Sequence, residues 1–347
     1  MSDMNLSLKQ INQWLTGAQL HGDSGLVVQR VNTDSRTCQV GDLFVALKGE
    51  RFDANDFLSQ VASNGATAAL AHHGLDAAKL AGVQVPDTRI ALGQLAKGWR
   101  SQFNLPVIAV TGSNGKTTVT QMIASILRAG FGDDALATQG NLNNDIGVPI
   151  TIANAPDGCD ALVLEMGMRG FGEIGRLCAV GQPFIGVITE VGDAHSSRVG
   201  GIDGVVRAKA ELVQSLPADG IAIVNADSVN AMRTVIGIDA RVVTFGSQDG
   251  ADVLWSIRSV DESGRHIAVF RYGAQEASGL VPLPGLHMVS NAAAAIAVGI
   301  HCGMPLQDAV NALASAAGTP QRMQWVANKA GLRILDDSYN ANSLSVV

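Results

Sequence analysis

PVIAVTGSNGKTTVTQMIASIL, from Pro106 to Leu127, is the stretch that decides the fold. It reads as a short buried strand, a loop with glycines at Gly112 and Gly115, and then a helix. The loop and the first helical residues give T-G-x-x-G-K-T-T, a shortened relative of the phosphate loop G-x-x-x-x-G-K-[ST]. Free backbone N–H groups of such a loop and of the following helical turn attract an anion. The stretch therefore predicts a nucleotide-phosphate site in which Lys116 reaches the β- and γ-phosphates and the Thr117 hydroxyl binds Mg²⁺.

Apolar runs and helical segments alternate along the chain on the C-terminal side of Pro106. They lie at 107–111, 117–129, 160–166, 184–189 and 221–225. This alternation predicts an α/β fold whose central domain, residues 101–318, is a mostly parallel sheet with helices on both faces. Further along we expect an antiparallel hairpin at 253–273, an alanine-rich helix at about 289–302 and another helix opened by Pro305.

Residues 1–100 precede the phosphate loop and predict a small α/β domain of their own. Leu6–Leu15 has helical spacing, 42–47 and 66–71 look like buried strands, and 55–64 looks like a helix between them. At the other end, 319–347 reads as a linker followed by one strand and a loop. Because one strand cannot bury a core, we expect this piece to open a further domain that the chain lacks.

Composition restricts the class of protein. The 347 residues are 47% hydrophobic and 16% charged, as expected for a folded, water-soluble protein of two or three domains. The formal net charge of −7 does not favour binding to nucleic acid or to anionic lipid. No signal peptide and no apolar run long enough to span a bilayer is recognisable. The four cysteines, Cys38, Cys159, Cys178 and Cys302, lack metal-ligand spacing, so we expect free thiols in the cytoplasm.

Three further residues are candidates for chemistry. Glu165 ends a hydrophobic strand, and an acid in this place beside a phosphate loop holds Mg²⁺ directly or through water. His195 follows another strand end and is either a metal ligand or proton carrier, or a histidine without a special role. Lys209 lies among apolar residues of a helix; it is either a desolvated lysine with a lowered pKa or a surface lysine. Gly170–Gly175 also satisfies G-x-G-x-x-G, but this lone pattern is weak and we do not predict a dinucleotide site there.

Two polar clusters in the first hundred residues are candidates for ligand contacts. TDSR occupies Thr33–Arg36, and KGERFDANDF occupies Lys48–Phe57. In a small α/β domain both would lie in loops at one edge of the sheet. Taken alone, each cluster is also compatible with a solvated turn.

Taken together, the motifs resemble those of the Mur ligases of peptidoglycan synthesis, and the resemblance covers essentially the whole chain. They are TDSR with GDLFVALKGERFDANDF, TGSNGKTT, TQGNLNNDIGVP, EMGMRGFGEI, GDAHSSRVGG, AKAEL, LPGLHMVSNAAAA and DDSYNAN. The resemblance implies three domains: one for the UDP part of the substrate, a central ATPase, and a C-terminal Rossmann-like domain. Of the last, the chain would contain only the beginning.

The resemblance also implies a reaction. The closest motif match is to the family member that adds D-alanyl-D-alanine to UDP-N-acetylmuramoyl tripeptide. ATP would phosphorylate the terminal carboxylate of the tripeptide, the dipeptide amine would attack the acyl phosphate, and phosphate would leave. The implied cofactors are ATP and Mg²⁺, and we expect a cytoplasmic monomer.

The family motifs place roles on particular residues of this chain. The ATP phosphates would be bound by Gly112, Ser113, Asn114, Gly115, Lys116, Thr117 and Thr118. The metals would be held by Thr117, Glu165 and His195, and Lys209 matches a lysine that is carbamylated in some members. Further contacts to the nucleotide would come from Asn291, Arg322 and Asp337. The UDP-linked substrate would meet Ser35, Arg36, Asn141, Asn143 and Asn144.

The sequence departs from the family pattern at Met288, where the family usually has an asparagine that contacts adenine. Two other interpretations remain open. One is a sister amide ligase, such as the preceding Mur step or folylpolyglutamate synthesis. The other is a truncated remnant that binds its ligands without turning them over.

Overall fold

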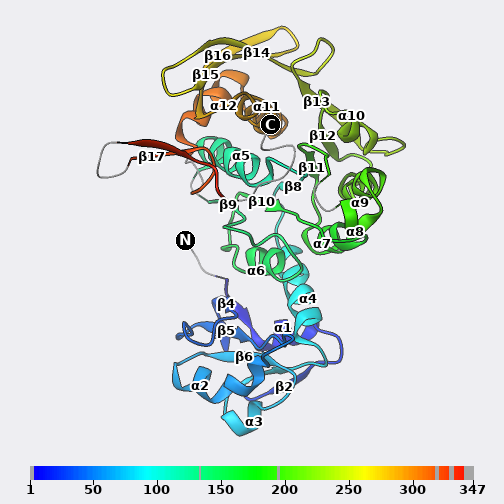
Figure 1. Ribbon diagram of the computed structural model, residues 1–347. Coiled ribbons are helices and arrows are strands. Elements are labelled where there is room, and N and C mark those ends of the chain that lie inside the picture. The colour runs from blue at the N-terminus through cyan, green and yellow to red at the C-terminus, as the bar shows by residue number, and fades with distance from the viewer. Residues whose placement is uncertain (1–3, 133, 194–195, 317–319, 328–331, 340–347) are drawn as a thin grey trace. The chain divides into compact units, whose positions relative to one another are not determined.

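The computed structural model describes residues 4–132, 134–193, 196–316, 320–327 and 332–339 (Figure 1). They form two compact units. Unit 1 comprises Met1–Leu105, Asn141–Cys159 and Ala179–Gly181, and unit 2 comprises Pro106–Gly140, Asp160–Cys178 and Gln182–Val347. Each unit contains both helices and strands, which confirms the predicted α/β class. The three-domain division stays a prediction.

Unit 1 is built on a five-stranded sheet in the order β2-β7-β6-β5-β4, in which only β2 is antiparallel to its neighbour. Its central strands are buried along their whole length, as expected for parallel strands covered on both faces. Its elements are β1 (Leu6–Ser7), α1 (Leu8–Trp14), β2 (Gln19–His21), β3 (Val27–Val28), β4 (Arg30–Asn32), β5 (Asp42–Val45), η1 (Ala54–Phe57), α2 (Leu58–Ser63), β6 (Ala68–Ala71), α3 (Leu75–Ala78), β7 (Gly82–Gln84), α4 (Thr88–Arg100) and α6 (Gly147–Ala153).

The helix α6 belongs to unit 1 although it comes after the phosphate loop in the chain. Just beyond its end, the Asn154 side chain accepts a hydrogen bond from the Val31 N–H (2.8 Å) and donates one to the Val31 carbonyl (3.0 Å). The amide thus satisfies the free edge of β4 as a neighbouring strand would. The Trp99 indole of α4 also donates to the Ala155 carbonyl (2.9 Å). These contacts are non-local, so the sequence pattern contained no sign of them.

Unit 2 is built on a nine-stranded sheet in the order β16-β15-β14-β13-β12-β11-β8-β10-β9. The strands from β9 to β14 pair in parallel and the last three are antiparallel, which confirms the predicted mostly parallel sheet and the hairpin. The elements are β8 (Val107–Thr111), α5 (Lys116–Phe131), β9 (Ala135–Ala137), β10 (Ala161–Glu165), α7 (Glu173–Gly181), β11 (Ile185–Ile188), α8 (Ser196–Val199), α9 (Ile202–Gln214), β12 (Ile221–Asn225), α10 (Val229–Arg233), β13 (Arg241–Gly246), β14 (Val253–Val260), β15 (Arg265–Tyr272), β16 (Gln275–Pro284), α11 (Leu286–His301), α12 (Leu306–Ala312), η2 (Leu313–Ser315), β17 (Gln324–Ala327) and β18 (Arg333–Asp336).

The core of unit 2 lies where α5, α11 and α12 pack together against the sheet. The alanine-rich α11 is buried over most of its length because its small side chains allow α5 to approach closely. At Gly299 of α11, a Cβ atom would overlap with the Ile126 side chain of α5. This packing holds α5, and with it the phosphate loop, against the sheet.

The strand order brings three strand ends together. β8 lies between β10 and β11, with Val110 beside Glu165 and Thr111 beside Ile188. Parallel strands place their carboxyl ends at one edge of the sheet, and loops at such an edge form ligand sites. The phosphate loop after β8 is therefore flanked by the residues that follow β10 and β11.

All four cysteines are free thiols. Cys38, Cys159 and Cys178 are buried, whereas Cys302 is half-buried. Burial raises the pKa of Cys38 to about 11, of Cys178 to about 12 and of Cys302 to about 11. Because the thiolate is the reactive form, these three thiols are unreactive near neutral pH.

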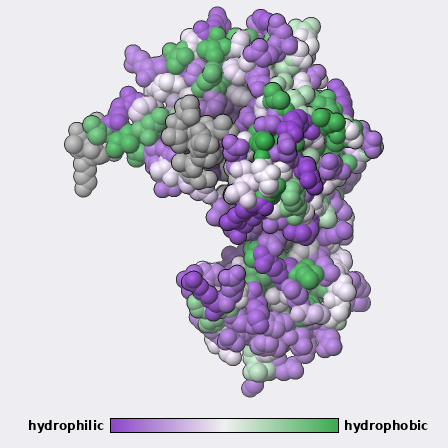
Figure 2. Space-filling model, turned by 45° about the vertical axis from the view of Figure 1, so that its right-hand side comes forward, coloured by the Kyte–Doolittle hydropathy of each residue, from purple (hydrophilic) through white to green (hydrophobic). Residues whose placement is uncertain are grey.

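The surface is mixed in character. On the face drawn in Figure 2, unit 1 is mostly hydrophilic. In unit 2, the antiparallel pair of β17 and β18 leaves Trp325, Val326, Ile334 and Leu335 exposed. The one strand predicted for 319–347 is confirmed as β18, but the prediction missed β17, which lies in the expected linker and pairs with β18. Within the described ranges, no helix is both long enough and apolar enough to cross a membrane.

Candidate functional site

The phosphate loop in unit 2 depends on glycine at two positions. Gly115 caps α5 with a φ of 81°, a left-handed conformation that favours glycine. A Cβ atom at Gly115 would come within 2.6 Å of the Asn291 side-chain oxygen, and one at Gly112 would overlap with the Thr189 hydroxyl. The predicted strand–loop–helix order is confirmed, and the loop lies tightly between α11 and the end of β11.

Lys116 is the first residue of α5, and its side chain folds back over the loop. Its ammonium donates hydrogen bonds to the carbonyls of Gly112 (3.0 Å) and Ser113 (3.4 Å). Burial lowers the pKa of this ammonium, while the nearby Glu165 carboxylate raises it and the Arg322 charge lowers it further. The ammonium is thus held against the backbone of the loop, and its contact with a phosphate stays a prediction.

Thr117 and Glu165 form a buried pair beside the loop. The Thr117 hydroxyl donates to the Glu165 carboxylate (2.7 Å), and the two residues are 5% and 2% exposed. The Glu165 backbone N–H donates to the Thr138 hydroxyl (3.0 Å), which fixes the end of β10. The structure therefore brings together two of the three predicted metal ligands. Oxygen donors of this kind are the ligands that Mg²⁺ takes in proteins.

His195, the third predicted metal ligand, lies outside the described residues. The described residues that follow β11, up to position 193, form hydrogen bonds with the phosphate loop. Thr189 donates to the Asn114 carbonyl (2.5 Å), and the Ser113 hydroxyl both donates to the Gly192 carbonyl and accepts from the Gly192 N–H (2.9 Å each). The role of Thr189 was not predicted from the sequence, although its place at the end of the apolar run at 184–189 was a usable signal.

Lys209 is the buried lysine of α9. It is 3% exposed, and no hydrogen bond or ion pair joins its ammonium to any described residue. Burial lowers its pKa well below the usual 10.5, and the positive charge of Lys116 adds to this shift. This excludes the surface interpretation of Lys209. It also shows that the two lysines are close enough to interact, although 93 positions separate Lys116 from Lys209 in the chain.

Of the predicted nucleotide residues, Asn291 lies on α11, whereas Arg322 precedes β17 and Asp337 follows β18. Asn291 of α11 faces Gly115, and its side-chain N–H contacts the Met288 sulfur (3.7 Å). Met288 is buried in the core, where an asparagine would need polar partners. Arg322 stacks over the Tyr339 ring (4.1 Å), and its Nε atom is buried without a partner among the described residues. Asp337 accepts a hydrogen bond from the Met323 N–H (3.2 Å).

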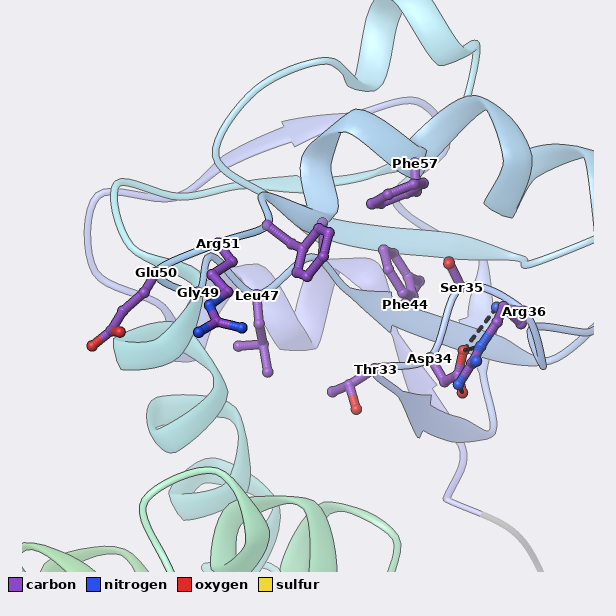
Figure 3. Close-up of a pocket in the computed structure, with 12 residues that line it drawn as sticks. Thr33, Asp34, Ser35, Arg36, Phe44, Leu47, Gly49, Glu50, Arg51 and Phe57 are labelled. Atoms are coloured by element: carbon purple, nitrogen blue, oxygen red, sulfur yellow. Dashed lines mark hydrogen bonds and ion pairs between the residues drawn. The ribbon is translucent and has the colours of Figure 1, made fainter.

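Unit 1 carries a separate open pocket of about 780 Å³ (Figure 3). The turn with Ser35 and Arg36 lines one side and the Gly49–Phe52 loop lines the other, so both polar clusters singled out in the sequence meet here. Arg36 forms two hydrogen bonds with the Asp34 carboxylate (2.9 and 2.7 Å). These bonds lower the pKa of Asp34 to about 2. The residues that line the pocket are Thr33, Asp34, Ser35, Arg36, Phe44, Leu47, Gly49, Glu50, Arg51, Phe52, Ala54 and Phe57.

The predicted substrate asparagines precede α6 in unit 1. Asn144 accepts hydrogen bonds from the N–H groups of Ile146 (3.1 Å) and Gly147 (2.9 Å), so it caps the helix. Asn143 donates its backbone N–H to the Asn141 carbonyl (2.8 Å). Asn144 thus has a structural task in addition to its predicted contact with substrate.

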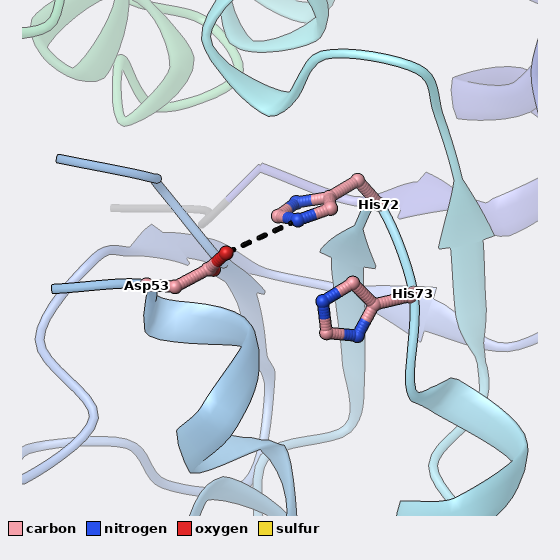
Figure 4. Close-up of side chains that lie close together, drawn as sticks. All are labelled: Asp53, His72 and His73. Atoms are coloured by element: carbon pink, nitrogen blue, oxygen red, sulfur yellow. Dashed lines mark ion pairs between the residues drawn. The ribbon is translucent and has the colours of Figure 1, made fainter.

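Asp53, His72 and His73 also lie together in unit 1 (Figure 4). The Asn55 side-chain oxygen accepts from the His72 backbone N–H (3.0 Å), which fixes the orientation of the amide. Its NH₂ group then donates to His72 Nδ1 (2.7 Å), so the imidazole proton lies on Nε2 and faces Asp53 (3.2 Å). A metal ion at Nε2 would have to displace this proton. We therefore interpret the cluster as a set of hydrogen bonds that connects the segment 48–57 to the end of β6.

Comparisons with known proteins show which family this chain resembles. Residues 110–299 match the family described as Mur ligase middle domain, and residues 27–100 match the one described as Mur ligase family, catalytic domain. The chain is 38% identical to the UDP-N-acetylmuramoyl-tripeptide–D-alanyl-D-alanine ligase of Escherichia coli (strain K12), over 98% of this chain and 74% of that one. For the Bacillus subtilis (strain 168) ligase of the same name, the identity is 35% over 92% and 69%.

Solved structures give the same result. A crystal structure of MurF from Acinetobacter baumannii superposes with a TM-score of 0.89 at 35% identity, covering 99% of this chain and 75% of that one. MurF ligase from Thermotoga maritima in complex with ADP superposes with a TM-score of 0.77 at 29% identity, covering 90% and 71%.

Proposed function

We propose a function for this chain on one premise: it belongs to the Mur ligase family. The chain is an ATP-dependent ligase that forms a C–N bond. It adds D-alanyl-D-alanine to UDP-N-acetylmuramoyl tripeptide, a step of peptidoglycan precursor synthesis. The observation that carries the proposal is the buried Thr117–Glu165 pair beside the Lys116 loop, in a chain that matches MurF relatives over nearly its whole length.

The loop is suited to the first half-reaction. The terminal carboxylate of the tripeptide attacks the γ-phosphorus of ATP, the bond to ADP breaks, and an acyl phosphate forms. Two anions must approach each other in this step, so positive charge at the γ-phosphate lowers the barrier. Lys116 supplies that charge, and N–H groups of the loop and of the first turn of α5 bind the phosphate oxygens, except that of Ser113, which donates to the Glu190 carbonyl. Arg322, Asn291 and Asp337 make the remaining nucleotide contacts.

In the second half-reaction the amine of D-alanyl-D-alanine attacks the acyl carbon. A tetrahedral intermediate forms, the bond to the phosphate oxygen breaks, and the amine loses a proton as phosphate leaves. Water must be kept out, because it would hydrolyse the acyl phosphate. For the chain's own residues this means holding the carboxylate and the phosphate still, a task that we assign to Lys116. We assign contacts with the substrate to Asn141, Asn143 and Asn144.

Mg²⁺ fits the donor set of the site. Thr117 and Glu165 offer oxygen atoms in a buried place, and we assign His195 to the same task. A bound Mg²⁺ would neutralise phosphate charge and orient the γ-phosphate. Because Thr117 donates to Glu165 in the described state, its hydroxyl lone pairs remain available for the ion.

We assign the pocket of unit 1 to the UDP part of the substrate. It combines the rings of Phe44, Phe52 and Phe57 with Arg51 and with Arg36, which is paired with Asp34, and this combination suits a flat base and a diphosphate. Ser35 and Arg36 meet the UDP moiety. Since ATP and nucleotide-linked precursors are used inside the cell, we propose that the protein is cytoplasmic. We also propose that it is a monomer.

Lys209 is expected to be carbamylated. Its lowered pKa raises the fraction of neutral amine at a given pH, and the neutral amine attacks CO₂ to give N–COO⁻ and one released proton. The new carboxylate removes the unpaired buried cation and offers oxygen atoms to a second Mg²⁺. A carbamate ¹³C signal should appear after equilibration with ¹³C-bicarbonate and fade as the pH falls through the lowered pKa.

Lys209→Ala should lack the ¹³C signal, whereas the exposed control Lys97→Ala should keep it. Removing bicarbonate should lower turnover of the wild-type protein by about tenfold, because the second metal loses a ligand. The assignment would be contradicted if Lys209 gave no carbamate ¹³C signal and turnover were the same with and without bicarbonate.

The function is tested by measuring phosphate release. We expect release to require ATP, UDP-N-acetylmuramoyl tripeptide and D-alanyl-D-alanine together, because the dipeptide amine is what discharges the acyl phosphate. Other acceptors and other amines, including glutamate with a folate acceptor, should give at most slow hydrolysis. Equal release without the dipeptide would sink the assignment. Calorimetric binding of nucleotide and tripeptide with no turnover would support a binding-only chain instead.

A further inference from the structure

The side chain of Glu211 in α9 caps the N-terminus of α7. One carboxylate oxygen accepts from the Gly172 N–H (2.6 Å) and the other accepts from the Gly175 N–H (3.0 Å). These N–H groups lie at the helix start, where no intrahelical carbonyl can pair with them, and a carboxylate there also interacts favourably with the helix dipole. The Gly170–Gly175 segment therefore already holds an anion, supplied by the chain itself.

A second contact joins the same two segments. The Arg207 guanidinium of α9 lies over the Phe171 ring at 5.0 Å from its centroid. Arg207 and Glu211 are four residues apart, so they project from one face of α9. We call these two contacts together the α9 clamp. Figure 1 shows α7 and α9 as neighbours in unit 2.

Lys209 lies between the two clamp residues in the sequence but on another face of the helix. A separation of two residues corresponds to about 200° around an α-helix, so Lys209 projects away from the clamp. Its side chain is 3% exposed, whereas Arg207 is exposed and Glu211 is half-buried. A rotation of α9 about its axis would thus move Lys209 out of its buried place.

The segment that the clamp holds is also the one that follows Glu165. β10 ends at Glu165, and α7 begins at Glu173 after a short loop. The clamp therefore connects the helix that carries Lys209 to the loop that continues from the predicted metal ligand. Of the two contacts in the clamp, the Glu211 carboxylate contributes more, because hydrogen bonds to a charged acceptor are strong.

We propose that Glu211 is a positioning residue: it fixes the rotation of α9 and so keeps Lys209 in place beside the phosphate loop. The inference rests on the proposed function for its effect on turnover, but its structural part does not. Glu211 touches no reacting atom; it acts through the backbone of Gly172 and Gly175.

The structural part is tested without ATP or metal, in buffer free of bicarbonate. In Glu211→Ala, hydrogen exchange at the Gly172 and Gly175 amides should accelerate by about tenfold or more, because two charge-assisted hydrogen bonds are lost. Labelling of the Lys209 amine by an acylating reagent, read by mass spectrometry, should also accelerate by about tenfold. Unchanged labelling of Lys209 would overturn the proposal, whether or not the wild-type chain ligates.

Glu211→Gln is a second variant for the case that Glu211→Ala does not fold. Glutamine keeps the shape but has one acceptor oxygen, so it should give effects between those of alanine and the wild type. The matched control is Asp203→Asn, which removes a carboxylate of the same helix whose ion pair with Arg233 is largely exposed. This control should change neither amide exchange at Gly172 nor labelling of Lys209.

Measurements of kcat and KM then distinguish a positioning role of Glu211 from a role in the stability of the fold alone. We expect Glu211→Ala to lower kcat by about tenfold while KM for ATP changes by less than about twofold, since the phosphate loop is not part of the clamp. A matching rise of KM for ATP, or an unchanged kcat with accelerated labelling, would overturn the positioning role. If the wild-type chain releases no phosphate, the proposed function fails, and the labelling result alone decides the structural inference.

Discussion

Lys116→Ala is expected to lower kcat/KM for ATP by about 10³-fold, the largest effect of any single substitution considered for this chain. The ammonium is anchored 3.0 Å from the Gly112 carbonyl and 3.4 Å from the Ser113 carbonyl, so it is placed before the nucleotide arrives. Although burial lowers its pKa, the phosphate oxygens of a bound nucleotide favour its charged form. Alanine removes this charge where negative charge concentrates during phosphoryl transfer.

The measurement is phosphate release at saturating tripeptide and dipeptide over a range of ATP concentrations. Lys116→Arg keeps a positive charge but not the position of the ammonium, so it should recover only a small part of the activity. Lys97→Ala, at an exposed position of α4, should behave as the wild type. If Lys116→Ala retained more than about a tenth of the wild-type value, the loop could not be the ATP site.

Glu165→Gln is expected to lower kcat by about 10²-fold and to raise the Mg²⁺ concentration needed for half-maximal activity. The residue is 2% exposed and accepts a hydrogen bond from Thr117. Glutamine can still accept that bond through its amide oxygen, so the fold should be kept while the negative charge is lost. A neutral amide is a weak ligand for Mg²⁺ in comparison with a carboxylate.

The test follows turnover across Mg²⁺ concentrations, with the unfolding temperature as a check on the fold. Glu276→Gln is the matched control, because it removes an exposed carboxylate of unit 2 that pairs with Arg271. That variant should show the wild-type Mg²⁺ dependence. A Glu165→Gln protein with unaltered Mg²⁺ dependence would show that this carboxylate does not hold the metal.

Much of the fold was predictable because its signals are local. Strand, loop and helix of Pro106–Leu127 follow one another in a pattern fixed by backbone geometry, and each apolar run between 107 and 225 became a strand or a helix where predicted. The phosphate loop could be recognised for the same reason: its chemistry depends on residues that are neighbours in the chain. Glu165 was predictable because parallel strands end at a common edge.

Non-local contacts could not be predicted in this way. The pairing of Asn154 with Val31 joins positions 123 residues apart and places α6 in unit 1. The Glu211 contact with Gly172 joins residues 39 apart. It places a carboxylate of the same chain on the G-x-G-x-x-G segment. Neither contact leaves a spacing pattern in the sequence, because each depends on how helices pack once the sheets have formed.

The sequence by itself determined the α/β class, the phosphate loop and the resemblance to the Mur ligases, since these rest on short-range order and on motifs. Only the tertiary structure decided the state of Lys209. From the sequence this residue was either a surface lysine or a desolvated one, and the fold buries it near Lys116 without a carboxylate partner among the described residues. The physical reason is that burial and charge depend on what surrounds a side chain in space, and α9 brings Lys209 there from 93 residues away.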